Sequence, residues 1–414
     1  MKVLQITGSD LAGGRFNGLL LRHHFQRIGV DTRYMVWRKA STDDAVVRKA
    51  LNYPGSRVLT YGLTRLEQLL SIQNALNLQW LGLPLYRAFR DADLLHYHLL
   101  HDGGYFSLLS LPWYARWKPA VWTLHDPWAM TGHCVHPMDC TGWLLGCPTC
   151  PHLDWIFPLA KDRAHLNFLL KQWSYQRSRL HLVVASPWMM RMVQRSPLMQ
   201  GLTVHHVPFG LDLQRFRPLP MGPARRRLGI PDDHVVICMR AMESPFKGME
   251  YVRAALRNLH VKRKVCLLTF QGEGGFDEFI GRYRIVELGW TDDEALLIDA
   301  YTAADFFLMP SVAEAFGMMA IEAMACGKPV ICFEGTALPE TTFAPEVGLA
   351  IPREAQALAA ALARWIDNPH EVAARGVRAR EIAEQHYGVD RFAAAIKRVY
   401  EAALQDGARR RPSA

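Results

Sequence analysis

Short runs of apolar and β-branched residues alternate with longer segments of helical periodicity along most of the chain. In the first half the runs cover residues 3–7, 30–36, 93–98, 120–124, 182–185 and 203–207. In the second half they cover residues 235–239, 264–270, 284–288, 305–309 and 330–333. Strands separated by helix-length segments are typical of parallel sheets. The pattern predicts an α/β protein with two doubly wound, Rossmann-like domains.

A segment rich in Pro and Gly, residues 208–223, separates the two series and marks the domain boundary. A chain of 414 residues is long for one core and sufficient for two. We expect an N-terminal domain over 1–207 and a C-terminal domain over 208–388. A last helix is expected over 389–406, followed by a disordered tail over 407–414.

Composition and charge narrow the class of protein. Apolar residues make up 50% and charged residues 21%, as in ordinary globular proteins. A net charge of +9 favours anionic partners such as nucleotides, nucleic acids or an acidic membrane face. The start of the chain lacks the apolar core of a signal peptide, and no apolar stretch reaches about 18 residues. We therefore expect a cytoplasmic protein whose membrane contact, if any, is peripheral on the inner face.

The most informative motif contains two carboxylates, Glu314 and Glu322, eight residues apart with Phe316 and Gly317 between them. The apolar run after Gly317 predicts a buried helix, with Glu314 in the preceding loop and Glu322 inside the helix. Backbone N–H groups at that helix N-terminus suit a phosphate. The two carboxylates can accept hydrogen bonds from hydroxyls on two different rings. This pattern indicates a site for a phosphorylated, polyhydroxylated ligand.

Two cations follow the first strand of the second series. Arg240 and Lys247 stand seven residues apart around a turn that contains Pro245 and Gly248. Arg can grip a pyrophosphate in bidentate fashion, and Lys adds a mobile charge. Together they would stabilise the negative charge that develops on a leaving nucleoside diphosphate.

These motifs resemble family 4 of the retaining glycosyltransferases, which have the GT-B fold of two Rossmann-like domains facing across a cleft. The resemblance implies that Glu314 faces the donor sugar and Glu322 the nucleotide ribose. It implies that His125, in the motif His125-Asp126 at a strand end, lies against the donor sugar. It also implies that the last helix crosses back onto the first domain. The implied catalytic residues are His125, Arg240, Lys247 and Glu314. The implied donor-binding residues are Gly13, Gly14, Gly272, Gly289, Phe316, Gly317, Met318, Met319 and Glu322.

Four cysteines, Cys134, Cys140, Cys147 and Cys150, lie in one segment, residues 131–155. The last two have the spacing of a metal knuckle, and four thiolates complete a tetrahedral zinc set. His133, His136 and His152 are possible substitutes, while free thiols or an iron–sulfur centre are the alternatives. In a reducing compartment a metal is favoured over disulfides. The segment resembles a Cys-rich insertion of bacterial surface-polysaccharide glycosyltransferases.

The predicted function is transfer of a sugar from a UDP- or GDP-type donor to a hydroxyl of a glycan or lipid-linked acceptor. No catalytic metal is expected, because Arg240 and Lys247 can replace a divalent ion. One alternative is a GT-B enzyme acting on a soluble small molecule or a tRNA nucleoside. Another is a zinc-containing nucleic-acid-binding protein, which is disfavoured because no nucleic-acid-binding motif is recognisable. The basic amphipathic segment 161–179 suggests contact with an anionic membrane.

Overall fold

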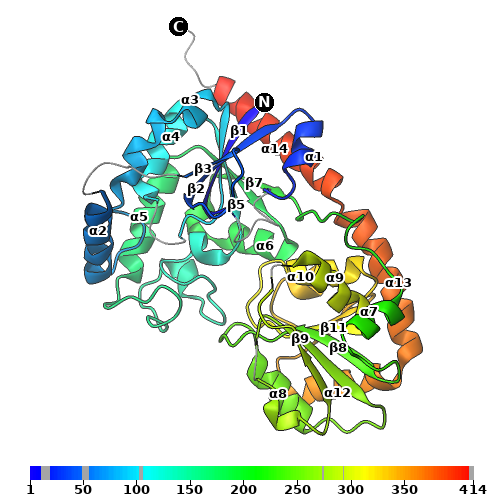
Figure 1. Ribbon diagram of the computed structural model, residues 1–414. Helices are drawn as coiled ribbons and strands as arrows, with labels where there is room; N and C mark the ends of the chain where they lie inside the picture. The colour runs from blue at the N-terminus through cyan, green and yellow to red at the C-terminus, as the bar shows by residue number, and fades with distance from the viewer. Residues whose placement is uncertain (11–18, 49–55, 102–105, 273–274, 292, 410–414) are drawn as a thin grey trace. The chain divides into compact units, whose positions relative to one another are not determined.

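The computed structural model describes residues 1–10, 19–48, 56–101, 106–272, 275–291 and 293–409. The chain divides into two compact units (Figure 1). Unit 1 combines Met1–Gly210 with Val389–Ala414, and unit 2 is Leu211–Gly388. Each unit is built on one parallel sheet.

Unit 1 contains a sheet of seven strands in the order β3-β2-β1-β4-β5-β6-β7 within the described residues. All neighbouring strands pair in parallel. The strands are β1 (Lys2–Ser9), β2 (Asp31–Arg38), β3 (Val46–Arg48), β4 (Leu94–Tyr97), β5 (Ala120–Leu124), β6 (Leu180–Val184) and β7 (Thr203–His206).

Helices surround this sheet in the sequence order that a doubly wound fold requires. The α-helices are α1 (Arg22–Arg27), α2 (Ser56–Leu70), α3 (Arg87–Asp91), α4 (Leu111–Trp117), α5 (Ala164–Gln176), α6 (Pro187–Arg195) and α14 (Val389–Arg409). The short 3-10 helices are η1 (Leu78–Leu85), η3 (Leu108–Ser110), η4 (Pro127–Met130), η5 (Gly142–Leu145) and η6 (Pro197–Met199).

Unit 2 contains a parallel sheet in the order β10-β9-β8-β11-β12-β13. Its strands are β8 (Val235–Arg240), β9 (Val265–Phe270), β10 (Arg284–Glu287), β11 (Phe306–Met309), β12 (Val330–Phe333) and β13 (Leu349–Ile351). Its helices are α7 (Met221–Arg227), α8 (Met249–Arg257), η7 (Asp277–Phe279), α9 (Glu294–Ala303), α10 (Met318–Ala325), α11 (Leu338–Thr341), α12 (Ala355–Asp367) and α13 (Pro369–His386).

The apolar runs predicted as strands form the sheets, and the predicted fold class is confirmed. Central strands such as β5 and β9 are buried along their whole length, which explains why they read as continuous apolar runs. The sequence pattern missed β3 and β13. Each has three residues and lies at an edge of its sheet, too short for a period of apolar residues to stand out.

The last helix, α14, belongs to unit 1 (Figure 1). The carboxylate of Asp390 accepts hydrogen bonds from His24 at 2.9 Å and from Arg27 at 2.6 Å. Lys397 donates to the carbonyl of Ile28 at 2.8 Å. The helix continues to Arg409, so residues 407–409 are helical rather than part of the disordered tail predicted from 407. Residues 410–414 lie outside the described part of the chain.

Within the described residues, no helix has both the length and the apolar character needed to cross a bilayer.

Candidate active site

The first group of predicted residues lies at the carboxyl edge of the unit 2 sheet. Strands β8 and β11 are neighbours, and β8 ends at Arg240. Because parallel neighbours end at the same edge, the loops that follow them meet there. The first loop carries Lys247 and the second carries Glu314. Lys247 Nζ lies 3.1 Å from Glu314 Oε2.

The Lys247–Glu314 ion pair is largely shielded from water. Each side chain is 20% exposed. Lys247, Arg240 and Met319 line one pocket beside the end of β11. An ion pair removed from water costs desolvation energy, so a site that keeps one must compensate with good geometry or with a ligand.

Arg240 completes the cationic part of this pocket. Its Nη2 points to Met242 Sδ at 3.3 Å, and its buried Nε has no partner among the described residues. Burial lowers the pKa of the guanidinium, while Glu314 raises it. Arg nevertheless stays charged in proteins. A buried, unsatisfied donor on a cation is what an anionic ligand would satisfy.

Gly317 shapes the start of α10 beside the pocket. It caps the helix with φ of 100°, a left-handed conformation that favours glycine. A Cβ at this position would lie 2.5 Å from Leu338 Cδ2. Met318 and Met319 form the first turn of α10, and Met319 also lines the cation pocket. The helix N-terminus predicted to hold phosphate therefore adjoins both cations. The preceding Phe316 is buried, and its ring packs edge-on against another aromatic ring at 5.9 Å.

Glu322 is a fully buried carboxylate inside α10. Tyr301 of α9 donates its hydroxyl hydrogen to Glu322 Oε2 at 2.8 Å. Tyr301 could not be predicted from the sequence, because a tyrosine within an apolar helix gives no signal of its own. The structure thus places Glu322 in a hydrogen-bonded interior position, and its contact with a ribose stays a prediction.

The two glycine loops predicted to pass the nucleotide follow β9 and β10. A Cβ on Gly272 would lie 1.6 Å from the carbonyl oxygen of Ala241, so only glycine allows this loop to pass the loop after β8. Gln271 N donates to the carbonyl of Gly289 at 2.7 Å. Both glycines therefore lie at the same sheet edge as Arg240.

The second group of predicted residues belongs to unit 1. His125 follows β5, and its ring stacks on Phe209 with centroids 5.4 Å apart. His125 Nε2 lies 2.9 Å from His98 Nδ1. Gly13 and Gly14 lie outside the described residues.

A chain of buried hydrogen bonds continues from His98. Its Nε2 lies 2.7 Å from Gln5 Oε1, and Gln5 Nε2 donates to the hydroxyl of Tyr400 at 3.1 Å. The Tyr400 hydroxyl lies 2.8 Å from His96 Nδ1. Since Gln5 Oε1 can only accept, His98 carries its proton on Nε2 and accepts at Nδ1. His125 must then donate from its Nε2. The network starts at Tyr400 of α14 and fixes which ring nitrogen of His125 carries the proton. The sequence did not reveal this network.

Burial keeps these imidazoles neutral. It lowers the pKa of His96 to about 3 and that of His125 to about 4. For His125 the nearby Asp126 carboxylate opposes this effect, and Asp126 itself pairs with His101 at 3.1 Å.

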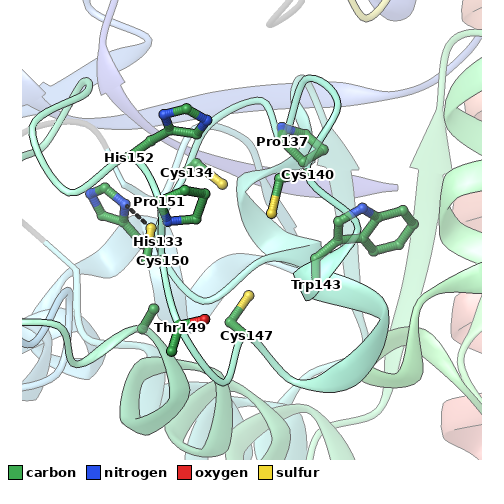
Figure 2. Close-up of a pocket in the computed structure, with 11 residues that line it drawn as sticks. His133, Cys134, Pro137, Cys140, Trp143, Cys147, Thr149, Cys150, Pro151 and His152 are labelled. Atoms are coloured by element: carbon green, nitrogen blue, oxygen red, sulfur yellow. Dashed lines mark hydrogen bonds between the residues drawn. The ribbon is translucent and has the colours of Figure 1, made fainter.

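The four cysteines gather around one pocket, together with His133 and His152 (Figure 2). All four are free thiols. Cys147 Sγ accepts from the N–H of Gly132 at 3.2 Å, and Cys140 Sγ accepts from the N–H of Gly142 at 3.4 Å. Cys150 Sγ lies 3.7 Å from His133 Nδ1. The prediction that the four cysteines lie close together is confirmed.

The predicted zinc site is not supported by this arrangement. In the part of the chain that the structure describes, no group of three or more His, Cys, Asp or Glu side chains is placed to hold a metal. Burial also raises the pKa of the Cys134 thiol to about 12, which disfavours the thiolate form that binds a metal. His136, named as a possible substitute ligand, stacks on Trp188 at 5.3 Å.

Known proteins resemble this chain, in particular over the segment that contains Arg240, Lys247 and Glu314. Residues 233–368 match the family described as Glycosyl transferases group 1. A D-inositol 3-phosphate glycosyltransferase of Saccharomonospora viridis is 33% identical over 49% of this chain and 50% of its own. A putative colanic acid biosynthesis glycosyl transferase, WcaC of Escherichia coli, is 27% identical over 60% of this chain and 61% of its own. The chain spans about half the length of the first curated relatives that it matches.

Solved structures extend the likeness to both units. Sucrose-phosphate synthase from Thermosynechococcus elongatus superposes with a TM-score of 0.68, at 20% identity, over 98% of this chain and all of its own. Anabaena HepE in complex with UDP-glucose gives 0.63, at 17% identity, over 97% of this chain and all of its own. The fold is GT-B. The predicted resemblance to glycosyltransferases is supported, while identities this low establish the fold alone.

We predict that acid destabilises unit 1 through the buried histidines. His96 and His125 are neutral when folded, with pKa values of about 3 and about 4, against about 6.5 in an unfolded chain. Below pH ~6.5 the unfolded chain binds more protons than the folded chain. The free energy of unfolding therefore decreases as the pH is lowered. The slope reaches up to about 1.4 kcal/mol per pH unit for each group. Urea unfolding at several pH values between about 7.5 and 4.5 measures this slope.

The variant His96→Gln should show a shallower pH dependence than the wild type. Its control is His370→Gln, at an exposed position in α13 of unit 2, which should keep the wild-type slope. An unchanged slope in His96→Gln would contradict the account.

Proposed function

We propose that this protein is a retaining glycosyltransferase. It moves a sugar from a nucleotide-sugar donor of UDP or GDP type to a hydroxyl of a glycan or lipid-linked acceptor in surface-polysaccharide synthesis. The observation that carries this proposal is the pocket lined by Arg240 and Lys247, with Glu314 paired to Lys247, within the segment that matches group 1 glycosyltransferases. The UDP and UDP-glucose complexes of HepE support a nucleotide-sugar donor.

The two cations bind the pyrophosphate in this proposal. Arg240 has an unsatisfied buried Nε, and Lys247 has one anionic partner, Glu314. A pyrophosphate offers Lys247 a second anion, which loosens its hold on Glu314. Glu314 can then accept hydrogen bonds from hydroxyls of the donor sugar. Ligand binding thus replaces an internal ion pair by a ligand-bridged one.

The chemistry needs charge stabilisation more than a protein base. The bond between the sugar's anomeric carbon and the diphosphate oxygen breaks, and a bond to the acceptor oxygen forms on the same face of the ring. The acceptor proton passes to the leaving diphosphate oxygen. Arg240 and Lys247 stabilise the charge that grows on the diphosphate, which lets catalysis proceed without a divalent ion.

The remaining predicted residues take supporting roles. By the family resemblance, Glu322 accepts from the ribose, and the loops of Gly272 and Gly289 pass the nucleotide. The same resemblance assigns His125 to the donor sugar, and the tautomer of His125 is set by the hydrogen-bond chain that ends at Tyr400. The Gly13 and Gly14 loop completes the proposed donor-binding set.

Two kinds of relative support two different classes of acceptor. WcaC is named for colanic acid biosynthesis, which supports a surface glycan, and it aligns over the larger share of this chain. The D-inositol 3-phosphate glycosyltransferases support a soluble small-molecule acceptor, which is the second candidate. We place the protein in the cytoplasm, in peripheral contact with the inner membrane. A nucleic-acid-binding function is disfavoured, because the curated relatives of this chain are glycosyltransferases.

We predict that one member of a panel of UDP- and GDP-sugars is turned over, and that Lys247→Ala lowers the rate by roughly 10²-fold or more. Loss of a charge-stabilising donor in a shielded site has effects of this order. The assay measures release of nucleoside diphosphate with membrane lipid extract as acceptor, and transfer of label into the organic phase.

Lys264→Ala is the matched control, because that lysine is exposed and paired with Asp233 in the same unit. It should keep wild-type turnover. Full activity in Lys247→Ala would refute the site assignment. Label that enters only water-soluble products would favour the second candidate.

We separately propose zinc as the ligand of the cysteine pocket. Its support is that Cys134, Cys140, Cys147 and Cys150 line one pocket and that backbone N–H groups already donate to two of the sulfurs. Such donors also stabilise metal-bound thiolates. Binding requires the four sulfurs to draw together from the positions described above.

Elemental analysis of the purified protein tests this proposal. We predict about one zinc per chain in the wild type and a loss of zinc in Cys147→Ser. Cys266→Ser, at a buried cysteine of unit 2, should retain the metal. A wild-type protein without zinc would remove the proposal and leave the transferase function untouched.

A further inference from the structure

A row of buried polar side chains connects α14 with His125 through the interior of unit 1. Gln5 in β1 is 1% exposed, His98 after β4 is 3% exposed, and Tyr400 in α14 is fully buried. Gln5 lies in the middle of this row, because its Oε1 accepts from His98 and its Nε2 donates to the hydroxyl of Tyr400. Buried polar groups without partners are destabilising, so the row is stable only when each bond in it is made.

The row continues on the other side of Tyr400 to the strand that precedes His125. The Tyr400 hydroxyl lies 2.8 Å from His96 Nδ1, and His96 Nε2 lies 2.7 Å from Thr123 Oγ1. Thr123 is buried in β5, close in sequence to His125. The hydrogen bonds of the row therefore link β1, β4 and β5 to α14.

Gln5 is the one group of this row whose donor and acceptor ends cannot exchange roles. An imidazole can carry its proton on either ring nitrogen, and a Tyr or Thr hydroxyl can rotate to donate in either direction. A side-chain amide instead has an oxygen that only accepts and a nitrogen that only donates. The orientation of the Gln5 amide therefore determines the direction of every other hydrogen bond in the row.

Two complete sets of directions satisfy the same pairs of atoms. With Gln5 Oε1 on His98, as in the structure, His98 accepts from the Nε2–H of His125, and His125 Nδ1 is unprotonated. With the amide turned over, Gln5 Nε2 would donate to His98, and His98 would donate from Nδ1 to His125. His125 would then carry its proton on Nδ1. The ring would change from an acceptor to a donor at Nδ1 with no change in charge.

Tyr400 makes the orientation seen in the structure possible. Its hydroxyl oxygen accepts from Gln5 Nε2 at 3.1 Å, while its hydrogen can go to His96 Nδ1. Without this hydroxyl, the amide nitrogen of Gln5 would lose its acceptor. Buried N–H groups without a partner are rarer than carbonyl oxygens without one, so the amide would turn its nitrogen to His98.

We propose that Gln5, supported by Tyr400, is a positioning residue that places the proton of His125 on Nε2 and keeps Nδ1 as an acceptor. A ligand hydroxyl that reaches this nitrogen must then donate its hydrogen. Gln5 and Tyr400 act through His98 and His125. The inference relies on the proposed function only for the assignment of His125 to the donor sugar.

Nitrogen NMR of the histidine rings tests the proposal without donor or acceptor. In the full chain labelled with ¹⁵N in histidine, two-bond ¹H–¹⁵N correlations at neutral pH show which ring nitrogen carries the proton. The signals of His125 are those missing from His125→Gln. We predict that the wild type carries this proton on Nε2.

Two variants should move the His125 proton to Nδ1 in most molecules. Gln5→Met keeps nearly the same volume but removes the acceptor of His98, whose proton is then better placed on Nδ1, where it bonds His125. Tyr400→Phe removes the acceptor of the Gln5 amide nitrogen. Both variants should also lower kcat/KM for the nucleotide-sugar by roughly five- to tenfold, the effect of one lost hydrogen bond in the transition state.

The matched control is Tyr175→Phe, at a buried tyrosine of α5 in the same unit. The Tyr175 hydroxyl has no hydrogen-bond partner among the described residues, so this variant should keep the wild-type His125 signals and turnover. Circular dichroism checks that each variant is folded, and either variant suffices if the other does not fold.

A wild-type His125 with its proton on Nδ1 would overturn the proposal, as would a proton that stays on Nε2 in a folded Gln5→Met or Tyr400→Phe. A proton that moves without any loss of turnover would overturn the role of these residues in the reaction. A wild type that turns over no nucleotide-sugar would refute the proposed function, while the NMR result would still decide whether Gln5 sets the tautomer. The two failures are therefore distinguishable.

Discussion

The candidate site depends on one geometric constraint, that neighbouring parallel strands end at the same edge of a sheet. Strands β8 and β11 pair in parallel, so the loops that follow them meet although their residues are far apart in sequence. This brings Lys247 to 3.1 Å from Glu314 and places Arg240 in the same pocket. The attraction between these opposite charges offsets their loss of hydration. A bound diphosphate can supply the same attraction to the two cations.

The fold class could be predicted from the sequence, and so could the residues that gather at the carboxyl edge of the unit 2 sheet. Buried parallel strands such as β5 and β9 are continuous apolar runs, and the chemistry follows strand ends. Partners that depend on packing could not be predicted. Tyr301 of α9 donates to Glu322 of α10, and Tyr400 of α14 reaches His96 of β4, only because separate elements pack together in the fold. Cysteine spacing predicted proximity, but proximity alone does not arrange four sulfurs around a metal.

Helix α2 of unit 1 shows a second limit of what hydrophobic periodicity can predict. The periodicity of an amphipathic helix reveals that it has two faces, but not which face the protein covers. In α2 the buried Glu67 accepts hydrogen bonds from the backbone N–H groups of Ala75 and Leu76, which keeps this carboxylate on the inner side of the helix. Val58, Tyr61 and Leu69 lie on the other side of the helix and are exposed.

Thermal unfolding in the presence of UDP, GDP, ADP, CMP and dTDP, compared between wild type and Lys247→Ala, tests the donor pocket most directly. A ligand at about 100 times its dissociation constant adds roughly 2.7 kcal/mol to the free energy of unfolding. For a protein of this size that raises the midpoint by a few degrees. The account predicts such a shift with UDP or GDP and its loss in Lys247→Ala. A wild type that no nucleoside diphosphate stabilises, or a shift that survives in the variant, would contradict it.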